Sequence, residues 1–229
     1  MISARVARRL RDEFAVRLEA RPDTLDEYVI EEVLKRPGYL EHLGVTGADR
    51  VLDIGANIGA FTCIAAKVAR AVVGYEPEPE NAAIARRHIA ANRITNAELV
   101  EAAVVGRTQQ SAVLYLATGK NKGNHTMIER RGRQAVAVVS VGINTIVKQK
   151  KPTKIKIDCE GSEVEILRSL RAWNGIEAMA IEFHHALLGD TDVTIFTEIK
   201  QLLRSHFLIV EARDVVTWGY SMIYARGAR

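Results

Sequence analysis

The chain of 229 residues contains only two cysteines, Cys63 and Cys159, and they do not stand at framework spacings. This excludes a small disulfide-stapled domain, and we expect both thiols to be reduced and to serve in packing. No apolar run approaches the roughly 20 residues that span a bilayer, and the arginine-rich N-terminus lacks the apolar core of a signal peptide. We therefore expect a cytoplasmic protein without a membrane span.

A large excess of one charge is also missing. The 32 lysine and arginine residues exceed the 28 aspartate and glutamate residues by only four. This balance does not demand a nucleic-acid partner, although it leaves a polyanion open. Because 48% of the residues are hydrophobic, the chain can bury one good core. We expect one globular domain with a small appendage.

The N-terminal part has the pattern of two helices. An apolar residue recurs every four positions, between arginines, at Ile2, Val6, Leu10, Phe14 and Leu18. This apolar face should dock onto the main domain or onto a second subunit of a homo-oligomer, with a membrane-surface or RNA-binding helix as the less favoured alternative. Thr24 and Glu27 have capping-box spacing at the start of a second helix, which residues 36–38 should end. Residues 1–47 are thus predicted to be a helical extension.

Residues 48–229 are predicted to form the main domain, because short β-rich runs alternate with helical patterns from residue 50 onward. Strands are expected at residues 50–54, 71–75, 97–101, 153–158, 176–183, 207–211 and 220–224. Helices are expected at residues 59–69, 79–92, 161–172 and 192–205. The alternation predicts an α/β fold with a doubly wound, mostly parallel sheet, in which the last strand returns antiparallel.

An inserted β element is predicted around residues 111–141. Two β-like runs, 111–117 and 135–141, flank a basic segment with a mobile tip, residues 119–133. The cations of this segment are Lys120, Lys122, Arg130, Arg131 and Arg133, against the single acid Glu129. Such a run is usually a solvated loop. The functional alternatives are a lid over a substrate or a clamp for phosphate groups, as on RNA or a nucleotide-linked sugar.

The turn after the first predicted strand, VLDIGANIGA, points to a nucleoside ligand. Gly55 and Gly59 allow a tight turn, but their spacing departs from the G-x-G-x-x-G dinucleotide fingerprint. Asp53 would repel a pyrophosphate and attract a cationic group. Glu76 ends the second strand, where a carboxylate can accept both ribose hydroxyls. Each acid alone is more simply a helix cap or a solvated strand end, but together they indicate S-adenosylmethionine.

Five segments, DIGANIGAF, YEPEPEN, VEAAV, KIDCEGSEVEIL and IEFHH, resemble the FkbM-type family of class I S-adenosylmethionine-dependent methyltransferases over residues 50 to about 205. The resemblance implies a Rossmann-like sheet of seven strands and O-methylation of a small-molecule, sugar or glycan hydroxyl, with S-adenosylhomocysteine as the spent cofactor. It also implies a role for seven residues. Asp53, Gly55, Asn57 and Gly59 would line the methionine part of the cofactor, Glu76 would bind the ribose, and Glu101 with Ala102 would border the adenine.

The catalytic groups are expected at the ends of two later strands. Asp158 ends strand 153–158, across the crevice from the glycine turn, and strand 176–183 delivers Glu182 and His184 on one face. We predict Asp158, Glu182 and His184 as the catalytic set, with His184 or Asp158 as the base that takes the acceptor proton. An alternative is that the histidine only caps the strand or meets solvent.

Asp158, Glu160, Glu182 and His184 also have the ligand types of a magnesium or manganese site. Acids at strand ends more often bind a cofactor or cap helices, so a divalent metal is not expected and no metal ligand is predicted.

Two other functions stay open at this stage. An RNA-directed methyltransferase would use the basic 119–133 segment and the N-terminal helix. However, DCEG stands where base-methylating enzymes of this fold carry an N/D-P-P-F/Y motif, and no aromatic stacking platform is near it. The remaining alternative is a non-catalytic binding module of the same fold.

Overall fold

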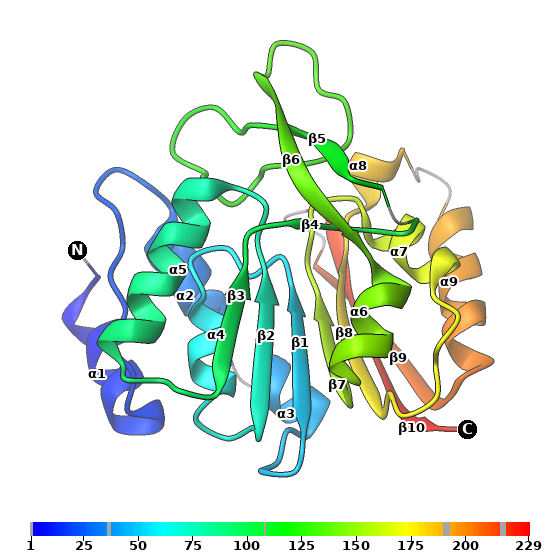
Figure 1. Ribbon diagram of the computed structural model, residues 1–229, viewed down its shortest axis with the longest axis horizontal. Coiled ribbons are helices and arrows are strands. Elements are labelled where there is room, and N and C mark those ends of the chain that lie inside the picture. Colours follow the sequence, from blue (N-terminus) through cyan, green and yellow to red (C-terminus); the bar gives the residue numbers. More distant parts are fainter. Residues whose placement is uncertain (1, 36–37, 108, 190–192, 216–218) are drawn as a thin grey trace.

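The computed structural model describes residues 2–35, 38–107, 109–189, 193–215 and 219–229, and a seven-stranded sheet lies at its centre (Figure 1). In spatial order the strands are β3 (Ala97–Val100), β2 (Ala71–Tyr75), β1 (Arg50–Ile54), β7 (Lys154–Ile157), β8 (Ala178–Phe183), β10 (Tyr220–Ala228) and β9 (Phe207–Val215). In this sheet β10 runs antiparallel to both of its neighbours, and all other pairs are parallel. The predicted doubly wound sheet, with its antiparallel last strand, is confirmed. The strand order reverses between β1 and β7, which is where such sheets bind ligands.

The helices of the main domain cover both faces of this sheet. They are α4 (Ala60–Ala65), α5 (Pro79–Ala91), α6 (Ile143–Lys150), α7 (Glu163–Ser169), α8 (His185–Leu188) and α9 (Thr194–Arg204). Four of them match the predicted helices with shorter bounds, whereas α6 and α8 were not predicted, and predicted position 192 lies outside the described residues. The start of α5 is well defined, because the Glu78 side chain accepts from the Asn81 N–H and Pro79 occupies the first turn.

Each face of the sheet buries its own apolar core, because side chains alternate along a strand. On β1, Leu52 and Ile54 belong to a cluster with residues of α6, α7 and α9. Val51 belongs to a second cluster, with residues of α4 and of the short helix α3 (Tyr39–Leu43). The near-continuous apolar strands of the centre therefore reflect burial on both sides.

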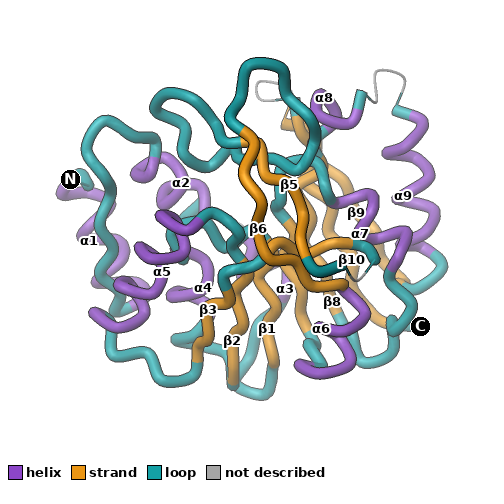
Figure 2. Tube along the Cα trace, turned by 45° about the horizontal axis from the view of Figure 1, so that its top comes forward, coloured by secondary structure: helices purple, strands orange, loops and turns teal. Residues whose placement is uncertain are grey.

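The N-terminal extension packs against the main domain of the same chain (Figure 2). Helix α1 (Ala4–Phe14) is shorter than predicted, because Ala15 takes a left-handed conformation with φ +52°. Val16 and Leu18 are nevertheless buried, in a cluster with Ile58 of the glycine turn and residues of α4 and α5. The apolar face predicted for docking is thus buried within this chain.

The second predicted helix is α2 (Asp26–Val33), and its predicted capping box is wrong. Leu25 is the N-cap residue, without a side-chain hydrogen bond, and Glu27 instead accepts from the Ser3 N–H at 2.9 Å. The predicted stop at residues 36–38 lies partly outside the described residues, and α3 follows it unpredicted. Among the described helices, none combines the length and apolar character needed to cross a membrane.

The inserted β element forms a second, three-stranded sheet. Its strands are β4 (Ala103–Val105), β5 (Ser111–Tyr115) and β6 (Ala135–Gly142). The predicted β5–β6 pair is present and antiparallel, and β4, which was not predicted, pairs parallel with β6. The connection between β5 and β6 is tied to the rest of the chain, because Lys120 O accepts from the Leu25 N–H at 3.0 Å and Lys122 O accepts from Asn81 Nδ2 at 3.0 Å.

Candidate active site

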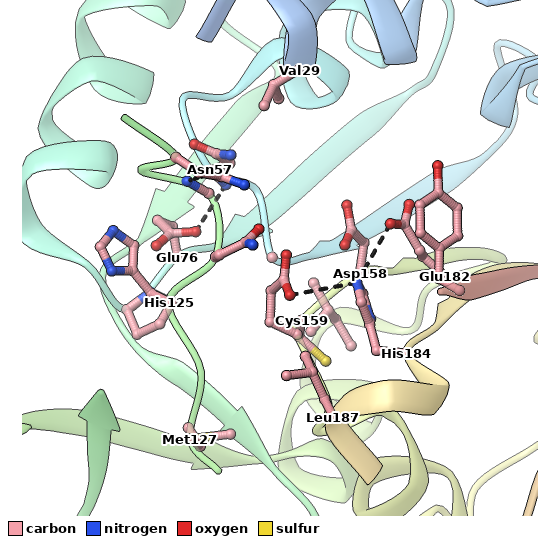
Figure 3. Close-up of a pocket in the computed structure, with 18 of the residues that line it drawn as sticks. Val29, Asn57, Glu76, His125, Met127, Asp158, Cys159, Glu182, His184 and Leu187 are labelled. Carbon is pink, nitrogen blue, oxygen red and sulfur yellow. Dashed lines mark hydrogen bonds and ion pairs between the residues drawn. The ribbon is translucent and has the colours of Figure 1, made fainter. Parts of the chain in front are cut away.

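A cavity of about 390 Å³ opens at the carboxyl ends of β1, β2, β7 and β8, at the reversal of strand order (Figure 3). The strand ends contribute Gly55, Asn57, Glu76, Asp158, Glu160, Glu182 and His184 to its wall. Two segments outside the sheet cover it. Helix α2 contributes Tyr28, Val29 and Glu32, and the β5–β6 connection contributes Asn121, Gly123, Asn124, His125 and Met127. The cavity therefore brings together seven residues that the sequence placed at strand ends, the β5–β6 connection, for which the sequence left a lid open, and helix α2, which it did not place there.

The two glycines of the turn after β1 have different roles. Gly55 has φ +79°, and a Cβ atom there would lie 1.7 Å from the Asp158 carbonyl oxygen, so only glycine allows the backbones after β1 and β7 to meet. Gly59 has φ +78°, and a Cβ atom there would lie 2.8 Å from Ala85 Cβ. Gly59 thus permits α4 to pack on α5, and it is not part of the cavity wall.

Asn57 and Glu76 form one end of the cavity. The Asn57 N–H donates to Glu76 Oε2 at 2.8 Å, and the Glu78 N–H donates to Glu76 Oε1 at 3.0 Å. Burial raises the pKa of Glu76 to about 7, although these two hydrogen bonds by themselves lower it. The side-chain oxygen of Asn57 is buried and has no hydrogen-bond partner among the described residues. An unpaired buried acceptor of this kind fits an incoming donor, such as an amino group.

Asp53 does not line the cavity, contrary to the sequence prediction. Its side chain is fully buried, accepts from Thr62 Oγ1 at 2.6 Å, and lies 3.2 Å from Lys156 Nζ. Asp53 and Lys156 are direct neighbours in the β1–β7 register, which explains the pairing. Because Lys156 neutralises it, Asp53 is not the carboxylate that meets a cationic ligand. Asp158, which lies 3.3 Å from the same Lys156 nitrogen, is on the cavity wall instead.

The predicted adenine border is displaced along the chain. Glu101 is exposed and forms an ion pair with Arg86 at 2.8 Å, and Ala102 is buried in the core. The wall at this place is made by Ala103 and Val104, together with Pro77. Neither of the two predicted residues therefore lines the cavity, whereas the next two residues along the chain do.

His184 lies at the centre of the opposite end of the cavity. Its Nε2 is 3.4 Å from Glu182 Oε1 and 3.6 Å from Glu160 Oε2. Its Nδ1 is 3.0 Å from Oε1 of Glu163, a fully buried residue at the start of α7. The predicted catalytic set of Asp158, Glu182 and His184 is therefore brought to one wall, which Glu160 joins, while Glu163 supports His184 from inside the protein.

The protonation of this cluster reflects crowding of carboxylates. Burial alone lowers the pKa of His184, but its hydrogen bonds to Glu163 and Glu182 outweigh burial and raise the pKa well above its usual value. Burial raises the pKa of Glu160 to about 8, and burial together with the Asp158 charge raises the pKa of Glu182. These contacts favour the protonated form of the imidazole, so His184 is a weaker candidate for the base than the carboxylates beside it.

Several residues of the site were missed by sequence reasoning. Lys156 sits in the apolar strand β7, and a lysine that is only 4% exposed needs a buried partner. Tyr39 donates its hydroxyl to Glu182 Oε2 at 3.0 Å from α3, a helix too short to predict. The signal in the sequence was ambiguous, because Lys154 and Lys156 alternate with isoleucines as on a half-exposed strand, whereas all four residues of β7 are buried.

Helix α2 divides its residues between two environments. Ile30 and Leu34, which follows the helix, are buried in the N-terminal core cluster. Tyr28, Val29 and Glu32 face the cavity. This division makes the N-terminal extension part of the site as well as part of the core.

Comparisons with known proteins agree with this geometry. The methyltransferase FkbM domain matches residues 53–207. The hexuronic acid methyltransferase AglP of Haloferax volcanii is 25% identical over 182 residues, which cover 72% of this chain and 71% of that protein.

Solved structures show the same fold at low sequence identity. Precorrin-6y C5,15-methyltransferase from Geobacter metallireducens superposes with a TM-score of 0.51 at 15% identity and covers 95% of each chain. A putative rRNA methylase from Clostridium thermocellum superposes with a TM-score of 0.51 at 11% identity, over 93% of this chain and 99% of the other.

Proposed function

The chain belongs to the FkbM methyltransferase family, and from this premise we propose that it transfers a methyl group from S-adenosylmethionine to a hydroxyl of an acidic sugar, free or within a glycan. The observation that carries the proposal is the cavity itself. One end has the acceptors that a nucleoside needs, Glu76 and Asn57, and the other end has a cluster of proton-accepting carboxylates. The similarity to a hexuronic acid methyltransferase supports the sugar class.

The residues at the β1–β2 end fit the cofactor. Glu76 accepts one backbone hydrogen bond on each oxygen, so each oxygen keeps a lone pair for a ribose hydroxyl. The unpaired Asn57 oxygen suits the amino group of the methionine part. Bound there, S-adenosylmethionine would supply an electrophilic methyl group, and Asp158 lies on the cavity wall where the backbones after β1 and β7 meet.

The β7–β8 end fits the acceptor. Methyl transfer forms a bond between the acceptor oxygen and the methyl carbon and breaks the carbon–sulfur bond, so the acceptor proton needs a base. Asp158, Glu160 and Glu182 lie on this wall, and one of these carboxylates takes the proton. His184, held by Glu163, positions their oxygens rather than acting as the base.

The coverings of the cavity would select the acceptor. Tyr28 and Glu32 of α2 and Tyr220 of β10 surround the acidic end, and the Tyr220 hydroxyl lies 3.1 Å from Glu32 Oε1. The cavity wall formed by the β5–β6 connection consists of uncharged residues and His125. The five lysine and arginine residues of the β5–β6 connection are not among the residues that line the cavity. A phosphate clamp over the site therefore has no support, and RNA is not proposed as the acceptor.

The first experiment tests whether the protein binds S-adenosylmethionine. Thermal unfolding would be followed with S-adenosylmethionine, S-adenosylhomocysteine and NAD, each at about a hundredfold excess over a micromolar dissociation constant. A ligand that binds the native state at that excess adds about 2.7 kcal/mol of stability. We expect both adenosyl ligands, and not NAD, to raise the midpoint. Stabilisation by none of them would refute the cofactor assignment.

The second experiment tests the acceptor. Transfer of labelled methyl from S-adenosylmethionine would be measured with oligosaccharides that end in a hexuronic acid and with matched neutral sugars. We expect label in the uronic acid series. Transfer to the neutral sugars alone would contradict an acidic acceptor, although it would leave the methyltransferase assignment intact.

A further inference from the structure

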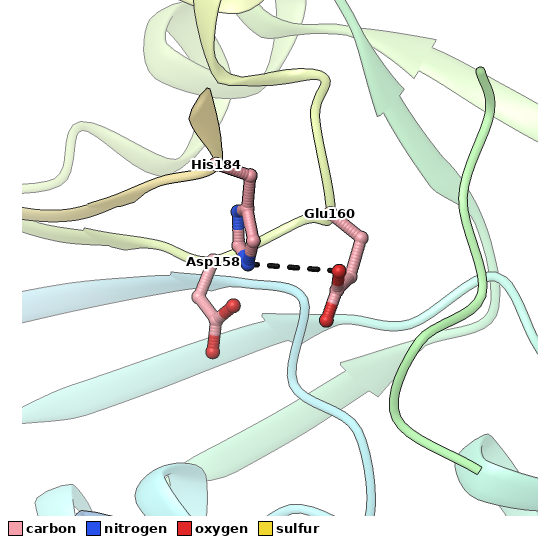
Figure 4. A group of neighbouring side chains, drawn as sticks. All are labelled: Asp158, Glu160 and His184. Atoms are coloured by element: carbon pink, nitrogen blue, oxygen red, sulfur yellow. Dashed lines mark ion pairs between the residues drawn. The ribbon is translucent and has the colours of Figure 1, made fainter. Parts of the chain in front are cut away.

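Three potential metal ligands meet on the acceptor wall of the cavity. Asp158, Glu160 and His184 each offer one ligand atom, and these three atoms lie within 4.8 Å of one another (Figure 4). Asp158 and Glu160 follow β7, and His184 follows β8, so neighbouring parallel strands deliver the set. All three line the cavity and are therefore reachable by an ion and by a substrate.

The orientation of His184 is that of a metal ligand. When a cation replaces the proton at Nε2, the imidazole still donates Nδ1–H to Glu163 and its Nε2 lone pair is free for the cation, and Nε2 faces Glu160 and Glu182. Glu163 is itself fixed, because its Oε1 accepts from the Cys159 N–H at 3.2 Å and the Gly161 N–H at 3.0 Å. Histidine ligands in metal sites commonly donate their second ring N–H to a carboxylate in this way.

The charges of the wall are unbalanced. Four carboxylates gather here, from Asp158, Glu160, Glu163 and Glu182. Among the described residues, Lys156 is the cation of permanent charge that pairs with this group, and it also neutralises Asp53. One imidazole proton cannot balance the remainder. Carboxylates held this close in a partly buried site need a further cation nearby or must take up protons.

We propose that Asp158, Glu160 and His184 bind a divalent cation of the magnesium or manganese class. Two carboxylate oxygens and one imidazole nitrogen suit these ions. Magnesium prefers about six ligands, so three protein ligands leave positions open for water and for acceptor oxygens. Glu182 lies beside the site and can receive the proton of a hydroxyl bound to the ion.

The use of the ion rests on the proposed function. The acidic wall would repel the carboxylate of a uronic acid, whereas a divalent cation reverses the local charge and can bind that carboxylate together with a neighbouring hydroxyl. The same ion favours loss of the hydroxyl proton before the oxygen attacks the methyl group. The cation thereby accounts for an acidic pocket that accepts an acidic sugar.

Manganese binding tests the site without any acceptor. The full chain would be stripped with EDTA, dialysed and titrated with MnCl₂, while electron paramagnetic resonance reports free Mn²⁺. We expect one Mn²⁺ per chain and a modulation of the spin echo from a directly coordinated imidazole nitrogen in the unmodified protein. Absence of that nitrogen coupling, or no uptake of Mn²⁺ up to millimolar concentration, would overturn the proposal.

Matched variants locate the ion. Asp158→Asn, Glu160→Gln and His184→Gln should each weaken Mn²⁺ binding at least tenfold, provided that the unfolding transition is retained. Glu98→Gln removes the same charge from an exposed residue on β3 and should leave Mn²⁺ affinity unchanged. Equal affinity in all four variants would place the ion elsewhere and refute the assignment.

A last experiment distinguishes a failure of the proposed cation site from a failure of the proposed function. Methyl transfer to a uronic acid acceptor should fall at least tenfold in EDTA and recover with Mg²⁺. Transfer that is undiminished by EDTA would refute the part given to the cation. Absence of transfer to every uronic acceptor, with Mn²⁺ bound at the cluster, would refute the proposed acceptor and support the cation site.

Discussion

The carboxylates at the two ends of the cavity have opposite environments. At the β1–β2 end, Glu76 is held by backbone N–H groups, which give direction without adding a charge. At the β7–β8 end, Asp158, Glu160 and Glu182 face one another around a single imidazole. The first end is complete before a ligand arrives and offers free lone pairs to neutral hydroxyls. The second end gathers more carboxylates than its protein partners balance, so it must take up protons or receive a cation.

The difference between the two ends of the cavity depends first on Lys156. Its ammonium group neutralises Asp53, so the carboxylates without a balancing cation are those on the cavity wall. Lys156→Met should lower the free energy of unfolding by about 3–5 kcal/mol, because Asp53 would stay buried without a cation. Urea denaturation measures the loss. Lys150→Met, which breaks a more exposed pair with Glu98, is the control and should cost at most about 1 kcal/mol. A loss of similar size in both variants would show that Asp53 does not rely on Lys156.

Gly55 joins the two ends, because its backbone touches that of Asp158. Gly55→Ala should cost roughly 2–3 kcal/mol of stability and should weaken S-adenosylhomocysteine and Mn²⁺ binding together, since the two loops must separate. Gly44→Ala isolates the conformational part, because Gly44 has φ +59° but open space around it. That control should cost about 1 kcal/mol and affect neither ligand. Calorimetry and titration report both effects, and equal losses in the two variants would contradict the close approach.

The pH dependence of S-adenosylhomocysteine binding tests the role of Glu76 at the β1–β2 end. If ribose hydroxyls donate to its ionised form, S-adenosylhomocysteine should bind about tenfold more weakly at pH 6 than at pH 8, because a group with a pKa of about 7 loses most of its charge over this range. Glu76→Gln should bind about as weakly as the protonated form at every pH. Isothermal titration at several pH values tests this, and an unchanged slope in the variant would assign the titration to another group.

The ligand-free protein should show the opposite trend at the same residue. Because burial raises the pKa of folded Glu76 above its unfolded value, Glu76 favours folding at low pH, and this contribution is lost as pH rises through about 7. Glu76→Gln should therefore flatten the pH dependence of stability between about pH 4.5 and 7. Thermal unfolding across this range provides the measurement, and a steeper dependence in the variant would reverse the sign argued here.

The smallest effect is expected at Tyr39, whose hydroxyl donates to Glu182 at the crowded end. Tyr39→Phe removes one buried hydrogen bond and should lower stability by about 1 kcal/mol. Tyr115→Phe, at a partly exposed position on β5, should change little. Urea midpoints compare the two, and a neutral Tyr39→Phe would mean that Glu182 needs no donor from α3.

The sheet could be predicted from the sequence because its seven strands are apolar runs of regular spacing and its main helices have a clear apolar face. Most of the elements that were missed are short: β4 has three residues and α8 has four, too few to show a period, whereas α6 was missed although it has eight. Helix α3, with five residues, is equally brief. Local pattern thus identifies long elements and fails where tertiary contacts alone stabilise the backbone.

The site was predictable to the extent that strand ends define it. Asn57, Glu76, Asp158 and His184 all follow predicted strands, and parallel strands end at one edge. The pairing of Asp53 with Lys156 could not be foreseen, because it depends on the register between β1 and β7. Glu163 was passed over for a related reason: its importance comes from a contact with His184, 21 residues away.

The two environments of α2 have a consequence for how such an enzyme can diversify. Its core side, with Ile30, contributes to folding, whereas its cavity side, with Tyr28 and Glu32, lines the cavity. Substitutions on the cavity side should therefore accumulate without loosening the core, since Tyr28 and Glu32 are not members of the N-terminal cluster that contains Ile30. Substitutions on one face of a single short helix can thus change acceptor specificity, while the N-terminal core and the sheet stay unchanged.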